Sequence, residues 1–229
     1  VPYKNTHKGY WNTGFNSHNA ITLSGGGDQG SFRASLGHQK NTWIMPNTGY
    51  ENYTASLNGN YKLSDRITVS SVVNYTRKTS DNLPSTGYNN GSIAYFMIMH
   101  SPNVSLDWYK PRWKDGFEGV GMIRPFSSYI DNPYVIANEA VNPMRSTQIV
   151  GNMKADIELA KNFNLMIRGA VNTFNQFREQ KRPFDLNRSP QGSYRRQDIT
   201  KMESNIDFLF NYSTKIGDDF TIDANFGGN

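Results

Sequence analysis

The stretch NYTASLNGNYKLSDRITVSSVVNYTR, residues 52–77, decides the fold that we expect for this chain. Mostly apolar side chains take every second position, with a short polar break at Ser64 and Asp65. Because successive side chains leave a β-strand on opposite faces, this period of two predicts two strands paired as an antiparallel hairpin. The apolar set is Tyr53, Ala55, Leu57, Gly59, Tyr61 and Leu63 before the break, then Ile67, Val69, Ser71, Val73 and Tyr75.

The length of these two strands points to a membrane. Each runs for about ten residues or more, which is what a tilted strand needs to cross a bilayer. Tyr53 and Tyr75 lie at the open end of the hairpin and Tyr61 lies near its turn. Aromatic residues at both strand ends are typical of the girdles of a transmembrane β-barrel.

The same alternation recurs along the chain and predicts eight strands in four hairpins. We expect strands at 18–24, 31–36, 53–63, 67–77, 148–159, 163–172, 202–212 and 220–226. Short turns at 25–30, 64–65, 160–162 and 217–218 alternate with irregular segments at 1–17, 39–51, 78–143 and 178–197. Short periplasmic turns and long external loops are typical of outer-membrane barrels. Within 78–143 we expect a short helix at 93–100 and a second helix beginning at Asn132 and Pro133, a cap residue followed by proline.

The composition favours a chain with one apolar and one polar surface. Only 36% of the 229 residues are hydrophobic, yet 13% are aromatic. Charged residues fall almost entirely on the polar side of the alternation, and a charge at the bilayer midplane would cost ~2–4 kcal/mol. These residues are Lys154, Asp156, Glu158, Arg168, Glu203 and Asp207. The predicted fold class is therefore all-β, a segment of a large antiparallel transmembrane β-barrel.

Several other classes find no support in the sequence. No apolar run approaches the ~20 residues of a transmembrane helix. The absence of cysteine excludes disulfide scaffolds, cysteine-ligated zinc and cysteine nucleophiles. The net charge is +5, but the basic residues are scattered, so we predict no nucleic-acid partner. His7, His18, His38 and His100 lack metal spacing, and we predict no metal and no cofactor.

The domain organisation follows from these expectations. The whole chain, 1–229, is expected to be part of a single barrel domain, with 78–143 as a long external loop within it. The last residues, FTIDANFGGN, stop within an expected strand. We therefore expect the chain to be an internal piece of a longer protein, or one processed at both ends.

Two stretches of the sequence resemble a known protein family. The run at 18–77, HNAITLSGGGDQGSFRASLGHQKNTWIMPNTGYENYTASLNGNYKLSDRITVSSVVNYTR, resembles the barrel of SusC/RagA-like TonB-dependent outer-membrane transporters. The DNPY at 131–134, followed by Arg145 and a new strand, is also similar. The order and spacing of these segments carry the resemblance more than any single motif does. It implies a barrel of about 22 strands with a plug, of which eight strands are present here.

The resemblance also implies a function. It implies energy-dependent import of a bulky nutrient, a glycan or an oligopeptide, across the bacterial outer membrane. A SusD-like surface lipoprotein would close over the external loops, and TonB would act through a plug domain that is not in this chain. No covalent chemistry is implied, so we do not expect an enzyme.

The long loop carries the candidate ligand-binding residues. Trp108, Tyr109 and Trp113 cluster in the sequence DWYKPRW, and aromatic rings offer stacking faces to sugars or peptides. Lys110 and Arg112 would add polar contacts. The competing interpretation is that these side chains pack within the loop or against the lipoprotein. Carboxylate pairs such as Asp115 with Glu118 have no spacing that would indicate a glycosidase.

Two alternatives remain at this stage. A siderophore-type or passive outer-membrane barrel would show the same alternation without the lipoprotein partner. A soluble β-rich carbohydrate-binding module would fold as a monomer without detergent. The sequence does not identify the cargo, the residues that contact it or the oligomeric state.

Overall fold

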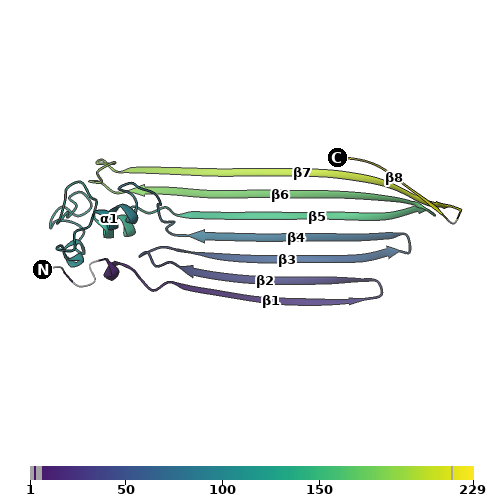
Figure 1. Cartoon of the computed structure of the whole chain (residues 1–229), viewed down its shortest axis with the longest axis horizontal. Helices are drawn as coiled ribbons and strands as arrows, with labels where there is room; N and C mark the ends of the chain where they lie inside the picture. The colour runs from purple at the N-terminus through teal and green to yellow at the C-terminus, as the bar shows by residue number, and fades with distance from the viewer. Residues whose placement is uncertain (1–2, 4–6, 218) are drawn as a thin grey trace.

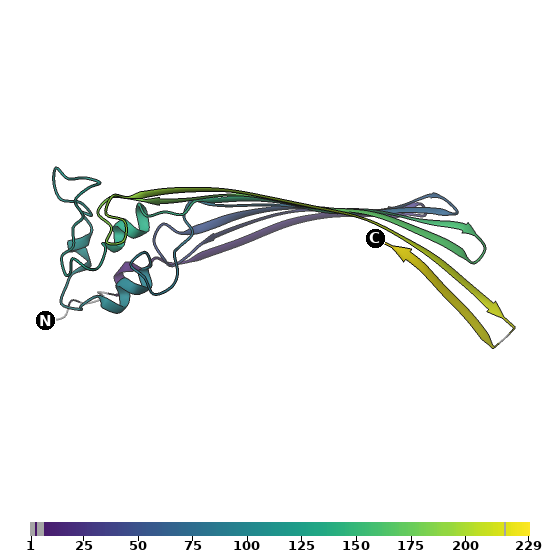
Figure 2. The ribbon, with the colours of Figure 1, turned by 90° about the horizontal axis from the view of Figure 1, so that it is seen from above.

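The chain folds as one long, curved sheet with a folded cap at one end of its strands (Figures 1 and 2). The computed structural model describes residues 3, 7–217 and 219–229. The strands are β1 (Phe15–Gly27), β2 (Gly30–Thr42), β3 (Gly49–Ser64), β4 (Ile67–Ser80), β5 (Met144–Ala160), β6 (Phe163–Arg182), β7 (Ser193–Ile216) and β8 (Phe220–Gly228). The helices are η1 (Lys8–Tyr10), α1 (Ile93–Met99), η2 (Leu106–Tyr109) and α2 (Pro133–Asn138). None of the helices in this part of the chain is long and apolar enough to cross a membrane.

The sheet has the simplest possible order, because every strand pairs antiparallel with its sequence neighbour from β1 to β8. Short turns at 28–29, 65–66 and 161–162 join the strands at one end. Longer connections at 43–48, 81–143 and 183–192 lie at the opposite end (Figure 1). The all-β class and the eight strands in four hairpins are therefore confirmed, and the sheet stays open across the described residues. Of the turn expected at 217–218, residue 218 lies outside the described residues, as do 1–2 and 4–6 of the segment expected to be irregular at 1–17.

The strand ends are where the sequence-based boundaries are wrong. The segments 178–182 and 193–197 were expected to belong to a polar loop, but they extend β6 and β7, which pair up to Arg182 and Ser193. Likewise β1 starts at Phe15, and β2 and β3 pair from Thr42 and Gly49 inward. Near the cap both faces of these strands are polar, so the alternation disappears while the backbone hydrogen bonds continue.

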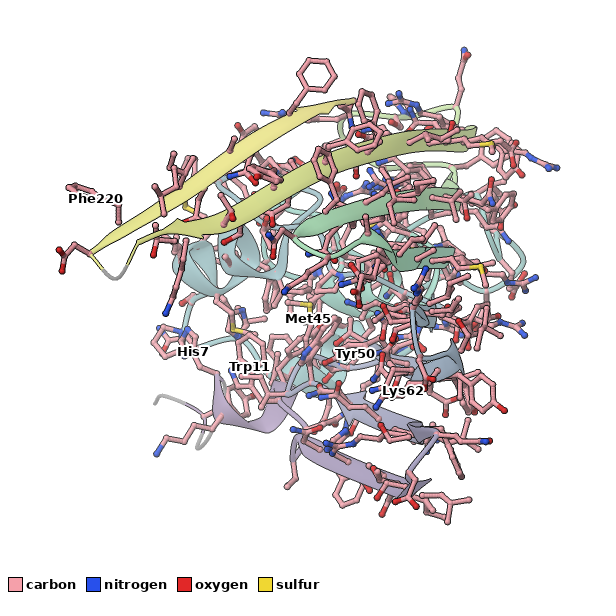
Figure 3. All side chains as sticks on the ribbon, turned by 90° about the vertical axis from the view of Figure 1, so that its right-hand side faces the viewer. His7, Trp11, Met45, Tyr50, Lys62 and Phe220 are labelled. Atoms are coloured by element: carbon pink, nitrogen blue, oxygen red, sulfur yellow. The ribbon has the colours of Figure 1, made fainter. Side chains whose placement is uncertain are left out.

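One face of the sheet carries apolar side chains from all eight strands. Pairing places Leu57 between Ala34 and Val73, and the same row reaches Leu23 on β1 and Val171 on β6. Many side chains of this face are exposed, for example Ile206, with 73% of its surface accessible. Phe220 projects clear of the other side chains on the β7–β8 hairpin (Figure 3). The other exposed members are Ile21, Leu23, Leu36, Leu57, Tyr61, Ile149, Met153, Ile167, Met202, Phe208, Ile222 and Phe226.

The opposite face is polar and its side chains bind one another across strands. Arg168 forms an ion pair with Asp207 of the neighbouring strand at 2.5 Å. Lys154 pairs within β5 with Asp156, two residues along the same face, at 2.7 Å. Further cross-strand hydrogen bonds join Thr22 to Ser35, Gln148 to Asn172 and Asn211 to Asn225. The predicted segregation of charge onto one face is thus confirmed.

The long connection between β4 and β5 folds into a compact unit with its own core. We call residues 3, 7–14, 43–48, 81–143 and 183–192 the cap module. Both helices predicted within it are present, and Asn132 caps α2 by accepting a hydrogen bond from the backbone N–H of Tyr134 at 2.9 Å. The buried side chains at the centre of the cap module include Tyr10, Ile93, Phe96, Leu106, Tyr109, Trp113, Met122, Ile130, Val135, Ile136 and Leu186.

Arg124 ties two connections of the cap module together. Its guanidinium donates hydrogen bonds to Asp131 Oδ1 at 3.2 Å and Asp185 Oδ2 at 2.9 Å, and also reaches the backbone carbonyl of Asp185. Asp131 is only 3% exposed and accepts further bonds from Asn187. Burial raises the pKa of Asp131, and the bonds from Asn187 and Arg124 oppose that rise. The cluster links 81–143 to the loop that joins β6 to β7.

Replacing Arg124 should loosen the cap module while the sheet stays intact. Arg124→Leu leaves the buried Asp131 carboxylate without its cation, a loss that typically costs roughly 3–5 kcal/mol. We expect faster amide hydrogen exchange at 122–137 and 183–187 in the full-length protein. Lys110→Gln is the matched control, because its pair with Asp107 is exposed and such pairs contribute little. Equal exchange in the two variants would contradict this role for Arg124.

Candidate functional site

The five residues singled out in the sequence lie on or just after η2, and the structure separates them into two groups. Tyr109 and Trp113 are 2% and 8% exposed and belong to the core of the cap module. Trp108 is 48% exposed, and Lys110 is exposed beside it. Arg112 is partly exposed and has a positive φ of 65°. The exposed group is therefore the one available to a ligand.

The geometry of η2 explains this separation. Ser105 caps it by accepting a hydrogen bond from the backbone N–H of Asp107 at 3.2 Å. Side chains three residues apart align in a 3₁₀ helix, so Leu106 and Tyr109 both face the core. Asp107 and Trp108 fall on the other sides of the turn and point outward. Sequence spacing alone did not fix which aromatic ring would be buried.

An aromatic and basic surface results at this edge of the cap. We define the aromatic–basic edge as Tyr3, Trp108, Lys110 and Tyr134. The rings of Tyr3 and Trp108 meet edge to face with centroids 5.8 Å apart. Lys110 bonds Asp107 at 2.5 Å, and this hydrogen bond raises the lysine pKa, so the ammonium stays charged at neutral pH. Burial raises the pKa of Tyr134, while the nearby charge of Lys110 opposes the rise.

Arg112 and Trp113 are engaged by Glu139, a residue the sequence did not single out. Arg112 Nη1 lies 2.9 Å from Glu139 Oε1, and the indole Nε1–H of Trp113 donates to the same oxygen at 2.9 Å. Glu139 follows directly after α2. These contacts fix the strand-like segment after η2 against α2 and thereby hold the aromatic–basic edge in place. No spacing signal could have shown this, because the partners are 26 residues apart.

Asn132 holds in place the turn that carries the aromatic–basic edge. It is fully buried, and its amide donates to the backbone carbonyl of Tyr109 at 2.8 Å and to that of Ile123 at 3.1 Å. The carbonyl of Tyr109 closes the end of η2, so Asn132 couples α2 to the turn that carries Trp108. One side chain thus caps one helix and positions another.

A buried histidine completes the packing around Tyr109. The ring of His100 stacks on Phe96 at 4.9 Å and meets Tyr109 edge to face at 5.8 Å. Burial lowers the pKa of His100, and the neighbouring His7, 5.4 Å away, lowers it further. Burial also raises the pKa of Tyr109 to about 12. At neutral pH this part of the core is therefore uncharged.

The chemistry of the site suits binding. Exposed aromatic faces and one cation can contact a ring or a planar peptide group. Among the described residues, no cluster of three or more His, Asp or Glu side chains could hold a metal ion. Glu118 accepts a hydrogen bond from the backbone N–H of Gly116 within its own exposed turn, and Asp107 is paired with Lys110.

Comparison with known proteins yields a match in structure. No protein-family model matches the sequence, and no curated protein does. The RagAB peptide importer superposes in its 'closed-closed' state with a TM-score of 0.71 over 93% of this chain, and in its 'open-open' state with 0.73 over 95%. Another structure of the RagAB peptide transporter gives 0.72 over 93%. Sequence identity is 17% in all three.

The match covers a part of those proteins. This chain spans 24% of the length of each RagAB chain that it matches. At 17% identity the similarity establishes the fold. The resemblance noted in the sequence is confirmed at that level: the eight-stranded sheet has the fold of the corresponding part of the RagAB chains.

Proposed function

We propose that this chain forms part of the outer-membrane barrel of a TonB-dependent transporter that imports a bulky nutrient, a peptide or a glycan. The observation that carries the proposal is the two-faced sheet with its cap module at one end, in the fold of the RagAB peptide importer. In this proposal the chain moves a ligand and catalyses no covalent step. A plug domain outside this chain would connect it to TonB.

The dimensions of the apolar face support a place in the bilayer. On β7 the apolar positions run from Met202 to Tyr212, and on β5 from Ile149 to Leu159. About ten residues at ~3.4 Å each, tilted by ~45°, span roughly 24 Å. That height agrees with the ~25 Å apolar band of outer-membrane barrels. A soluble carbohydrate-binding module would leave this face in water.

The cap module would then lie outside the cell, above the polar face that lines the lumen. In this arrangement the aromatic–basic edge is the surface of this chain that first meets cargo. Trp108 offers a stacking face and Lys110 a cation, while Tyr109 and Trp113 hold the turn in place from the core. Arg112 contributes through its partly exposed guanidinium.

A SusD-like surface lipoprotein is the partner that we propose for the cap module. Single exposed hydrophobic residues are common on any protein, but the cap carries several. They are Tyr88, Ile98, Phe117, Val120, Phe126 and Tyr129. A siderophore-type or passive barrel would have no such partner. Co-purification of a lipoprotein with the full-length protein supports the importer, and repeated isolation of the barrel alone would favour that alternative.

Matched charge substitutions on adjacent residues test the membrane placement. Ile206 lies on the apolar face and Asn205 on the polar face of the same strand. Ile206→Arg should destabilise the vesicle-embedded full-length barrel by ~2–4 kcal/mol, because the charge meets hydrocarbon. Asn205→Arg should change it little, because the side chain meets water. The measurement is urea-induced unfolding in lipid vesicles, and equal effects of the two substitutions would refute the lipid-facing assignment.

The aromatic–basic edge is tested by removing its exposed ring. Trp108→Ala in the full-length complex should weaken cargo binding about fivefold to tenfold, because the stacking contact is lost. Phe184→Ala is the control, since this exposed aromatic lies on the 183–192 loop of the same cap. Cargo retained on purified complexes would be quantified by mass spectrometry after incubation with a peptide mixture or an oligosaccharide mixture. Unchanged retention with Trp108→Ala would remove this edge from the binding site.

A further inference from the structure

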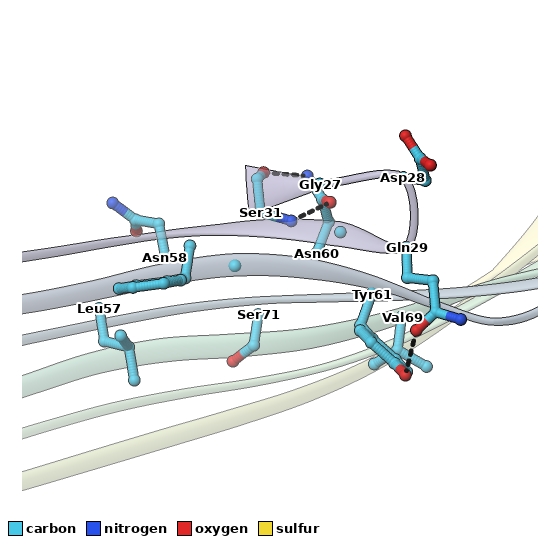
Figure 4. Close-up of a pocket in the computed structure, with 13 residues that line it drawn as sticks. Gly27, Asp28, Gln29, Ser31, Leu57, Asn58, Asn60, Tyr61, Val69 and Ser71 are labelled. Carbon is cyan, nitrogen blue, oxygen red and sulfur yellow. Dashed lines mark hydrogen bonds between the residues drawn. The ribbon is translucent and has the colours of Figure 1, made fainter. Parts of the chain in front are cut away.

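A hollow interrupts the apolar face near the turn end of β1 to β4, far from the cap module (Figure 4). Its volume is about 820 Å³. The side chains of Phe32, Leu57, Tyr61, Val69 and Ser71 line it and share the apolar face, because β2, β3 and β4 pair in register there. The hollow therefore opens toward the same surroundings as the rest of that face.

The hollow forms above Gly59 of β3, which has no side chain. Gly59 lies between Phe32 on β2 and Ser71 on β4. Leu57 and Tyr61 lie two residues before and after Gly59, so their Cα atoms are roughly 13 Å apart along β3. A Cβ atom on Gly59 would lie 3.3 Å from the carbonyl oxygen of Ser31 and 3.9 Å from Phe32 Cβ. That contact with the β2 backbone is tight, so glycine suits the close approach of β2 and β3, and the space above Gly59 stays empty of side-chain atoms.

The two ends of the hollow differ in polarity. Leu57 closes the end toward the middle of the strands, and Phe32 lies beside Gly59 on β2. At the other end the hydroxyl of Tyr61 donates to Gln29 Oε1 at 3.0 Å, beside the turn at 28–29 (Figure 4). The Gln29 Nε2 group points away from Tyr61 and is exposed at the turn (Figure 4). An occupant with an apolar tail and a hydrogen-bond acceptor at one end would fit this gradient.

We infer that the hollow binds one membrane phospholipid, with an acyl chain over Gly59 and its ester or phosphate oxygens at Gln29. The inference rests on the proposed function, which places the apolar face in the bilayer. The hollow is continuous with that lipid-facing surface, and Tyr61 marks the level where aromatic girdles meet the headgroups. A soluble ligand would have to cross lipid to reach it.

Packing rather than hydrophobicity would hold the lipid. Lipid tails are as apolar as leucine, so no hydrophobic gain comes from moving a tail into the hollow. The gain comes from dispersion contacts with Phe32, Leu57 and Val69 on three sides, and from the hydrogen bond at Gln29. A tail on the flat remainder of the face has contacts on one side. The bound lipid should therefore survive detergent extraction better than its neighbours.

Filling the hollow tests the inference in the full-length barrel. Gly59→Leu places a side chain where the acyl chain would lie. Gly169→Leu is the matched control: it lies in the same cross-strand row, has no atom within 4 Å of an added Cβ, and does not line the hollow. The proteins would be extracted in mild detergent from membranes rich in phosphatidylethanolamine, and retained lipid would be counted by native mass spectrometry.

The expected result is one phospholipid retained by the wild type and by Gly169→Leu, and at least fivefold less by Gly59→Leu. Gln29→Ala should lower retention without filling the hollow, which separates a headgroup contact from a folding defect. Equal retention by Gly59→Leu and Gly169→Leu, with both variants folded, would overturn the inference and leave the importer proposal intact. A full-length protein that stays monomeric and folded without detergent would overturn both.

Discussion

The sheet depends on the two-residue period of its strands, because this period makes one face of a single-layered sheet apolar and the other polar. A slip of one residue in any pairing would move that strand's apolar set to the polar face. The register is held at the turns. Between β5 and β6 the pairing shifts at Glu158 and Ala160, and Asn162 follows with a φ of 74°. Asparagine tolerates this left-handed conformation better than most residues, so the turn sets the register that follows.

The cap module depends on a different kind of interaction. Its core is small, and buried polar groups join its segments. Asn132 reaches two carbonyls, and Arg124 reaches two carboxylates on different connections. Such groups are costly when unpaired and therefore favour one arrangement of an otherwise irregular chain. This explains how the long segment 81–143, with only a few turns of helix, holds a defined surface around Trp108.

The parts of this structure that the sequence predicted are those with a local signal. Alternation identified the β3–β4 hairpin and the apolar face, and Asn132 followed by Pro133 identified the start of α2. The outer halves of β6 and β7 lack alternation because both faces are polar there, so their strand character came only from the partner strand. The burial of Tyr109 and Trp113 was equally hidden, because the residues that cover them come from distant segments. The hollow at Gly59 required the register of three strands, which no single stretch contains.

The position of Arg124 links the cap module to the sheet. Asp185 and Asn187, which hold the Arg124 cluster, lie on the connection between β6 and β7 rather than on the long segment itself. The main chain around Asn132, which supports η2, adjoins Asp131 of the same cluster. Trp108 is therefore linked to the β6–β7 connection through its chain neighbour Tyr109, the hydrogen bond from Asn132 to the Tyr109 carbonyl, and the bonds from Asn187 to the adjacent Asp131. Because packed polar networks have discrete arrangements rather than continuous ones, a rearrangement of this cluster would shift the β6–β7 connection together with the cap module.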